Sequence, residues 1–209
     1  YNGVAHLEKT ILSVLNQTYP NIEYIIIDGG STDATSDLVN QYGKHLAKYV
    51  SEPDQGIYDA MNKGLALSTG DVVGFLNSDD LFASSDGVAA IAEAMADGAV
   101  DAAYGDLVFV DPKRTDRVVR YWRPGPYTCG ACARGWMAPH PTFYVRREFL
   151  LRAGGFNLEY RLQSDFELML RLFEIEKITA RFVPLTLVRL RVGGATTGSL
   201  RNIVRGNIE

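Results

Sequence analysis

A short apolar run, residues 72–76, ends directly in the polar residues Asn77, Asp79 and Asp80. Its length and its β-branched content are typical of a buried parallel strand. Polar residues at the end of such a strand lie where open α/β sheets bind their ligands. Carboxylate and amide oxygens suit Mg²⁺ or Mn²⁺ carrying a diphosphate better than they suit zinc. The same residue types also form solvated turns before helices, so this pattern alone leaves both interpretations open.

The bulk composition indicates one sizeable globular domain, or a domain with a small appendage, because 46% of the 209 residues are hydrophobic and 22% are charged. A formal net charge of −4 offers no basic field for nucleic acid. The sequence has no apolar run long enough to span a membrane, and its start does not resemble a signal peptide. We therefore expect a cytoplasmic protein.

The two cysteines form a lone Cys129-Gly-Ala-Cys132 motif. A zinc site would need further ligands, and beyond His140 no fourth ligand is evident. A redox pair would need a strand-to-helix setting, whereas the surrounding segment is a Gly-rich loop. We expect two reduced thiols.

A second candidate ligand turn follows the predicted strand at residues 22–27. It begins with Asp28-Gly29-Gly30 and leads through polar residues into another helix. Two glycines let the backbone approach a ligand closely, and a strand, a Gly-rich turn and a helix commonly build a nucleotide site. Neither the dinucleotide fingerprint nor the P-loop is present. Turn formation alone would also explain Asp28.

Hydrophobic periodicity and turn residues predict the remaining elements. We expect helices at about 5–17, 33–42, 57–64, 88–95, 148–153 and 163–173, strands at 48–51, 102–110, 118–122 and 140–146, one or two strands within 178–191, and a long loop at 123–139.

The helix predicted from residue 163 begins with Ser164, Asp165 and Glu167. Ser164 and Glu167 fit a capping box, which gives Glu167 a structural explanation. Asp165 lies in the first turn, where the helix dipole favours the ionised form, so stabilisation of the helix start would also explain this residue.

Several blocks together resemble the inverting family 2 glycosyltransferases of the GT-A fold, of the kind that builds bacterial surface polysaccharides. The resemblance covers nearly the whole chain. Its blocks are residues 1–2, 16–20, 27–33, 52–56, 60–64, 76–80, 140–141 with Arg146, and 164–167.

The resemblance implies an α/β GT-A fold, with a Rossmann-like, mixed and mostly parallel sheet flanked by helices. Residues 1–110 would form the nucleotide-sugar-binding half, and residues 111–209 the acceptor-binding half, of one domain. The first strand of the family's sheet would precede Tyr1 and is missing from the sequence.

The resemblance also implies roles for individual residues. Asp165 would be the catalytic base that takes the proton of the acceptor hydroxyl. Asp79 would bind Mn²⁺ or Mg²⁺, because the first position of the family's acidic motif is Asn77 instead of aspartate. The substrate-binding residues would be Asp28, Gly30, Asp54, Lys63, Asn77, Ser78, His140 and Arg146.

The implied reaction moves a sugar from a nucleotide-diphosphate donor, a UDP-sugar by expectation, to a hydroxyl of a saccharide or lipid-linked acceptor. A single base without a second nucleophile implies inversion at the anomeric carbon. A lipid-linked acceptor would place the protein peripherally at the inner face of the cytoplasmic membrane, although no amphipathic anchor is evident.

Two other functions stay open. One is a metal-dependent sugar nucleotidyltransferase, but the basic, Gly-rich phosphate loop expected near its N-terminus is not evident. The other is a non-catalytic sugar-nucleotide-binding module, which Asn77 and the missing strand make conceivable.

Overall fold

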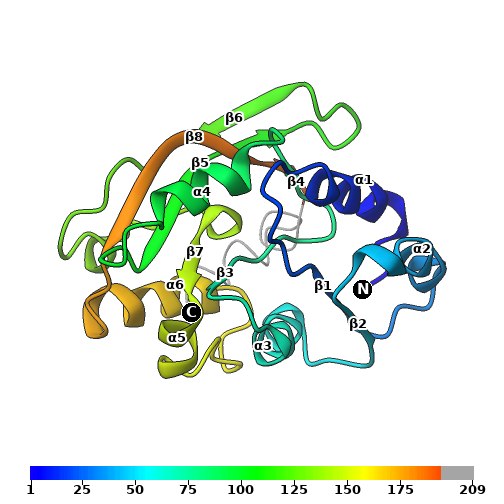
Figure 1. Ribbon diagram of the computed structural model, residues 1–209, viewed down its shortest axis with the longest axis horizontal. Coiled ribbons are helices and arrows are strands. Elements are labelled where there is room, and N and C mark those ends of the chain that lie inside the picture. The colour runs from blue at the N-terminus through cyan, green and yellow to red at the C-terminus, as the bar shows by residue number, and fades with distance from the viewer. Residues whose placement is uncertain (194–209) are drawn as a thin grey trace.

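Residues 1–193, the part that the computed structural model describes, form an α/β fold with two sheets. Figure 1 shows β1 and β2 beside α1 and α2 at one end, with the long strands β5 and β8 at the other. The elements are α1 Val4–Leu15, β1 Ile25–Asp28, α2 Thr35–Gln41, β2 Lys48–Ser51, α3 Ile57–Leu67, β3 Val72–Val73, β4 Leu81–Phe82, α4 Gly87–Ala94, β5 Ala102–Val110, β6 Val118–Trp122, β7 Tyr144–Arg146, α5 Arg147–Arg152, α6 Ser164–Leu170 and β8 Ala180–Arg191, with 3-10 turns at Gly43–His45, Cys132–Arg134 and His140–Thr142 and a π-helix at Arg171–Ile175.

The larger sheet has the order β3-β7-β5-β8-β4, with β6 also paired to β5. β5 and β8 run parallel, whereas β6 and β7 pair antiparallel with β5 near its two ends. The smaller sheet is the parallel pair β1–β2. The pairings β3–β7 and β4–β8 are also antiparallel. The sheet is therefore mixed as expected, but the prediction of a mostly parallel sheet is wrong.

The run 72–76 does not form the parallel strand that its apolar sequence predicts. Only Val72 and Val73 are in a strand, and they pair antiparallel with β7. The run is apolar because its side chains pack on both sides, Phe75 in one core cluster and Leu76 in another. Such two-sided burial indicates position in the core, but it specifies neither the pairing nor the direction of a strand.

Other predicted bounds agree with the structure. The strands predicted at 48–51, 102–110 and 118–122 have the observed bounds of β2, β5 and β6. The strand predicted from residue 140 begins only at Tyr144, after a 3-10 turn that contains Pro141. Proline lacks the N–H that a ladder needs, which explains the late start. Residues 178–191 contribute a single strand, β8.

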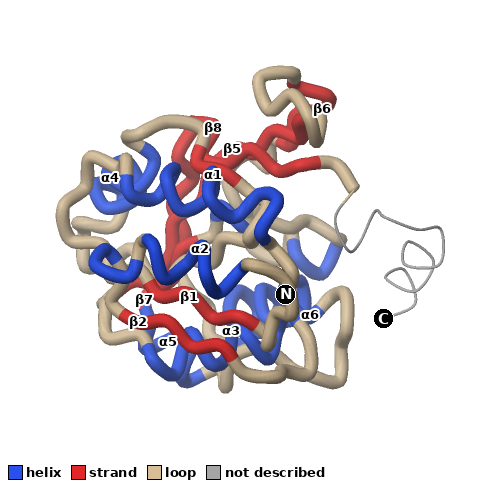
Figure 2. The backbone as a smooth tube through the Cα atoms, turned by 90° about the vertical axis from the view of Figure 1, so that its right-hand side faces the viewer, coloured by secondary structure: helices blue, strands red, loops and turns tan. Residues whose placement is uncertain are grey.

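Helix α1 shows how the sequence builds the core around the smaller sheet. Leu7, Ile11 and Val14 are buried and recur every three or four residues, so they form one apolar stripe. Leu7 and Ile11 pack in a cluster with Ile26 of β1 and Val39 of α2. Figure 2 shows β1 and β2 beneath α2, on the side of the molecule that faces the viewer.

The two expected halves of the chain share the larger sheet, because β3, β4 and β5 come from residues 1–110 and β6, β7 and β8 from residues 111–193. The last part of the expected acceptor half, residues 194–209, lies outside the described residues. Cys129 and Cys132 are free thiols, and burial raises the pKa of Cys132 to about 11.

A glycine is required in β5 where its pairing with β8 shifts register. A Cβ atom added to Gly105 would lie 2.7 Å from Leu187 Cδ1 and 2.8 Å from the Leu185 carbonyl oxygen. Gly105→Ala should lower the free energy of unfolding by about 1–3 kcal/mol through overpacking. Urea denaturation measures this change. Gly43→Ala is the matched control, since a Cβ there meets nothing within 4 Å; an equal effect of both variants would contradict the packing argument.

Candidate functional site

Asp28, the last residue of β1, is a buried carboxylate with three hydrogen-bond donors. The Ser31 amide donates to it at 2.9 Å and the Ser51 hydroxyl at 2.7 Å, and the Ser31 hydroxyl also donates. Burial acts to raise the pKa of Asp28, but these hydrogen bonds outweigh it and hold the pKa below its ordinary value. Asp28 is therefore an oriented anion at neutral pH.

The two glycines after Asp28 bring the loop that follows β2 close to this turn. Gly30 has a φ of 75°, which favours glycine. A Cβ on Gly29 would overlap the Asp54 carboxylate, so the absence of a side chain there admits Asp54. Asp54 also accepts a 2.9 Å hydrogen bond from the Gly56 amide at the start of α3. The structure thus brings Asp28, Gly30 and Asp54 together.

Lys63 joins the same group from α3. Its Nζ donates to the Pro53 carbonyl at 2.9 Å and lies 2.9 Å from Glu52 and 3.7 Å from Asp59. The hydrogen bond to Glu52 is the largest cause of its raised pKa. The ammonium is therefore charged and held against the loop that contacts the Gly29-Gly30 turn.

Residues 77–80 form a turn that is closed by internal hydrogen bonds and contacted by α1. The Asp80 amide donates to the Asn77 carbonyl at 3.1 Å, and the Asn77 side-chain amide donates to the Asp80 carboxylate at 3.0 Å. The Thr10 hydroxyl lies 2.9 Å from the Ser78 carbonyl oxygen and 2.8 Å from that of Asp80. Ser78 thus contributes to the turn through its backbone.

The two carboxyl groups of this turn differ in environment. Asp80 is 1% exposed, and burial together with the charge of Asp79 raises its pKa to about 8. Burial and a raised pKa make Asp80 less suited than Asp79 to bind a metal ion. Asp79 is only half-buried. Of the two, Asp79 is the carboxylate available to a ligand.

A metal held only by protein does not fit residues 1–193, where no three His, Cys, Asp or Glu side chains converge. Mg²⁺ in phosphate-transfer sites is usually bound by one or two carboxylates plus substrate phosphates and waters. Asp79 fits that second mode, in which the diphosphate supplies further oxygens.

Arg191, at the end of β8, is a residue that the sequence analysis missed. It is 3% exposed, and its guanidinium donates to the Asp79 carbonyl oxygen. Its Nε is buried and has no partner within residues 1–193. Arg191 therefore fixes the backbone beneath the half-buried carboxylate. A signal was present, because Arg189 and Arg191 follow the apolar pair Leu187-Val188 at a spacing of two, which places both arginines on one face of the strand.

Asp165 lies in the first turn of α6, as predicted, and contacts α3. Its Oδ1 accepts hydrogen bonds from the Tyr58 hydroxyl and the Phe166 amide, both at 3.0 Å. Tyr58 is a second residue that the sequence analysis missed, because nothing in the sequence pairs it with a residue 107 positions away.

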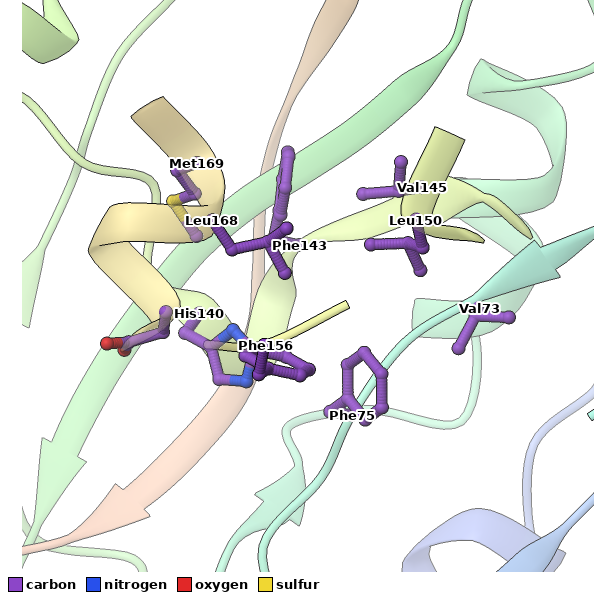
Figure 3. A pocket seen from close by; sticks show the side chains of 10 residues that line it. Val73, Phe75, His140, Phe143, Val145, Leu150, Phe156, Leu168 and Met169 are labelled. Carbon is purple, nitrogen blue, oxygen red and sulfur yellow. The ribbon is translucent and has the colours of Figure 1, made fainter. Parts of the chain in front are cut away.

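His140 and Asp165 are the polar residues that line an otherwise apolar cavity. Figure 3 shows the His140 ring beside those of Phe156 and Phe75. The rings of His140 and Phe75 are nearly parallel, and their centroids are 5.8 Å apart. Burial lowers the pKa of His140, and the charge of Asp165 opposes that shift. Its Nε2 is buried and has no partner within the described residues, so a neutral imidazole faces this cavity.

The capping box predicted at the start of α6 is wrong. No side chain caps this helix, and the Ser164 hydroxyl is buried without a partner in the described chain. Glu167 still has a structural role, because it forms an ion pair with Arg171 at 2.6 Å. The i,i+4 spacing, which helices favour for such pairs, explains this contact.

Arg146 lies apart from these groups. Its guanidinium donates to the carbonyl oxygens of Val100 at 2.9 Å, Met95 at 3.1 Å and Asp97 at 3.2 Å, just after α4. These contacts fix the chain between α4 and β5, so they give Arg146 a structural role.

Short contacts connect three parts of the site: the Asp28 turn, the 77–80 turn, and the pair His140 and Asp165. The Asn2 amide donates to the Ser31 hydroxyl at 2.6 Å, and a Cβ on neighbouring Gly3 would lie 3.3 Å from the Ser78 side chain. Residues 2–3 thus lie between the Asp28 turn and the 77–80 turn. Phe75 and Tyr58 connect these turns to His140 and Asp165. The structure thus holds two polar turns and the Asp165 carboxylate on connected elements.

Comparison with known proteins identifies the class. The family model described as glycosyl transferase family 2 matches residues 1–154. A PGL/p-HBAD biosynthesis glycosyltransferase of Mycobacterium bovis is 27% identical over 203 residues, which cover 95% of this chain and 77% of the relative. An uncharacterized glycosyltransferase of Mycobacterium tuberculosis is 34% identical over 190 residues, 88% of this chain and 70% of the relative. The chain belongs to glycosyl transferase family 2 and is a glycosyltransferase (EC 2.4).

Solved structures support the same fold. S. aureus TarS in complex with UDP has a TM-score of 0.74 at 18% identity over 92% of this chain. The mannosyltransferase PcManGT from Pyrobaculum calidifontis, in complex with GDP-Man and Mn²⁺, has a TM-score of 0.72 at 23% identity over 98% of this chain. At these identities the likeness shows an α/β, GT-A-like fold. The chain spans 58% of the length of each of these proteins.

The buried guanidinium of Arg191 should be needed for stability. Arg191→Met leaves the Asp79 carbonyl without its donor, so we expect a loss of about 1–3 kcal/mol in the free energy of unfolding. Denaturant titration measures this loss. Arg189→Met, which removes a half-buried arginine of the same strand and a 3.3 Å bond to the Thr115 carbonyl, should cost less. Equal losses would show that the contact with Asp79 has no special weight.

Proposed function

We propose that this chain transfers a sugar from a nucleoside-diphosphate donor to an acceptor hydroxyl with inversion at the anomeric carbon. The observation that carries the proposal is the position of Asp165. Asp165 lines a cavity together with His140. Its carboxylate accepts a hydrogen bond from Tyr58 of α3. Lys63 of the same helix contacts the loop beside the Gly29-Gly30 turn.

The donor would lie across the two turns. Asp28, an oriented anion, suits the N–H groups of a nucleobase, and the backbone at Gly30 permits close approach. Asn77 would contact the ribose with Ser78 beside it, and Asp54 and Lys63 would complete the site. Two TarS structures hold UDP and UDP-GlcNAc, and the PcManGT structure holds GDP-Man, which supports a nucleotide-sugar donor. Among these we propose a UDP-sugar.

Asp79 would bind Mn²⁺ or Mg²⁺ together with oxygens of the diphosphate. A divalent ion supplies Lewis-acid stabilisation of the charge that develops on a departing diphosphate. This chain's own contribution is to aim the Asp79 carboxylate, through the hydrogen bonds of Thr10 and Arg191 to the turn. The presence of Mn²⁺ in the PcManGT complex supports this assignment.

Asp165 would act as the general base. Within residues 1–193, the hydrogen bonds from Tyr58 and Phe166 both go to Oδ1 of Asp165, so Oδ2 would accept the proton. As the acceptor oxygen bonds to the anomeric carbon, its proton moves to Asp165 Oδ2. The bond from that carbon to the diphosphate oxygen breaks, so the nucleoside diphosphate leaves. One displacement on the face opposite the leaving group inverts the configuration.

The acceptor would approach from the side of His140. Its neutral ring, with an unpaired Nε2, suits a hydrogen bond to a hydroxyl group. We propose a saccharide or lipid-linked alcohol as acceptor. Relatives that make glycolipids, such as the M. bovis PGL/p-HBAD biosynthesis glycosyltransferase, favour testing a glycolipid acceptor first.

Replacement of the proposed base tests the reaction. Asp165→Asn should lower the rate of sugar transfer at least about a hundredfold, because general-base catalysis contributes at least that much, while donor binding survives. Product formation and donor titration measure the two effects. The matched control is Glu167→Gln, two residues further along α6, which should keep most of the transfer rate. Near-normal turnover of Asp165→Asn would refute the assignment.

Replacement of the proposed metal ligand tests the donor site. Asp79→Ala should abolish the Mn²⁺-dependent part of donor binding, because the other carboxyl group of the turn, that of Asp80, is buried. Calorimetric titration of a UDP-sugar with Mn²⁺ and then with chelator measures that part. Asp37→Ala, which removes an exposed carboxylate of α2, should bind as the unchanged protein does. Metal-dependent binding that persists in Asp79→Ala would exclude Asp79 as the ligand.

A further inference from the structure

The hairpin that joins β5 to β6 concentrates positive charge. Residues 111–123 contain five basic and two acidic residues, whereas the whole chain has 21 basic and 25 acidic residues. All five basic side chains are exposed. They are Lys113, Arg114, Arg117, Arg120 and Arg123. An acidic protein thus presents one cationic segment.

Large apolar side chains are exposed among these cations. Val118, Val119 and Tyr121 have exposed fractions of 39%, 59% and 57%. The pairing of β6 with β5 skips Val119, which interrupts the alternation of side chains there, so Val118, Val119 and Tyr121 all contribute to the exposed face of the strand. Arg123 also lies over the Tyr121 ring, with its guanidinium 4.8 Å from the ring centroid. The face therefore combines apolar, aromatic and cationic groups.

The hairpin projects from the protein at the end of the larger sheet that lies near the 77–80 turn. Figure 2 shows β6 and its turn projecting beyond the helices. At the base of the hairpin, Val110 pairs with Val118 on one side and with Arg191 on the other. Arg191 in turn donates to the Asp79 carbonyl oxygen. A partner or surface that binds to the hairpin would therefore lie near the 77–80 turn.

We propose that residues 111–123 dock the protein onto an anionic lipid surface. Basic side chains are attracted to anionic headgroups, and tyrosine and valine enter the interface beside them. The docking does not need the proposed reaction, but it would present a lipid-linked acceptor next to the site. The positive charge of the hairpin is complementary to the negative charge of such a surface.

A second copy of the chain fits this face less well. β6 is paired only with β5 in the described part of the chain, so its outer edge has free backbone groups that another strand could pair with. Arg120 is the middle residue of β6. A symmetric antiparallel pair centred on this strand would place Arg120 against Arg120, and like charges directly opposite destabilise such pairs.

The test is co-sedimentation of the full chain with lipid vesicles. Vesicles of phosphatidylcholine and phosphatidylglycerol in equal parts should bind the protein, and added salt should weaken the binding. Vesicles of phosphatidylcholine alone should not bind it. Arg114→Gln with Arg117→Gln should lower the partition coefficient about thirtyfold. Val119→Ser with Tyr121→Ser should also lower it, while the charge is unchanged.

The matched control is Lys9→Gln with Lys44→Gln, which removes the same charge from exposed positions on other elements. It should bind anionic vesicles as the unchanged protein does. The proposal fails if anionic vesicles do not bind the protein, or if the control loses as much binding as the arginine variant. It also fails if both hairpin variants bind normally, or if the hairpin instead holds a dimer in solution. None of these measurements uses sugar transfer, so the reaction and the docking can fail separately.

Discussion

The parallel pairing of β5 with β8 is the interaction on which the site depends. It runs from Ala102 opposite Ala180 to Val110 opposite Arg191. At its far end it places the Arg191 guanidinium under the 77–80 turn. Near its middle, the Thr142 hydroxyl lies 3.0 Å from the Gly105 carbonyl oxygen, which ties the segment after His140 to the same ladder. The residues that we propose for the acceptor and for the donor thus share this ladder as a common support.

Burial and hydrogen-bond donors together decide the direction in which the pKa of each carboxyl group of the site moves. Burial acts to raise the pKa of both Asp28 and Asp80. At Asp28 the hydrogen bonds from two serines outweigh burial and the pKa is lowered, whereas at Asp80 burial and the neighbouring charge of Asp79 outweigh the Asn77 amide and raise the pKa to about 8. The fold therefore favours the ionised form of Asp28 and the protonated form of Asp80.

The sequence allowed the prediction of those parts of the site that depend on local chemistry. The Asp28 turn, the 77–80 turn and the position of Asp165 in a first helical turn all follow from short-range patterns. Tyr58 and Arg191 could not be predicted in this way, because their partners lie 107 and 112 positions away. The direction of the strand that begins at Val72 was predicted wrongly for a related reason. An apolar run indicates that a segment is buried, but it does not indicate which strands lie next to that segment. The carbonyl partners of Arg146 after α4 could not be predicted either, because tertiary packing sets them.

Helix α3 explains how donor-side and acceptor-side groups can be held in one geometry. Tyr58 and Asn62 are four residues apart and share a face, where Tyr58 binds Asp165 and Asn62 forms two 2.8 Å hydrogen bonds with the Phe156 backbone. Asp59 and Lys63 share a second face, where Lys63 contacts the loop beside the Gly29-Gly30 turn. A helix transmits position along its length without a flexible joint. The spacing between Tyr58, which contacts the proposed base, and Lys63, which contacts the loop beside the Gly29-Gly30 turn, is therefore fixed within about one and a half helical turns.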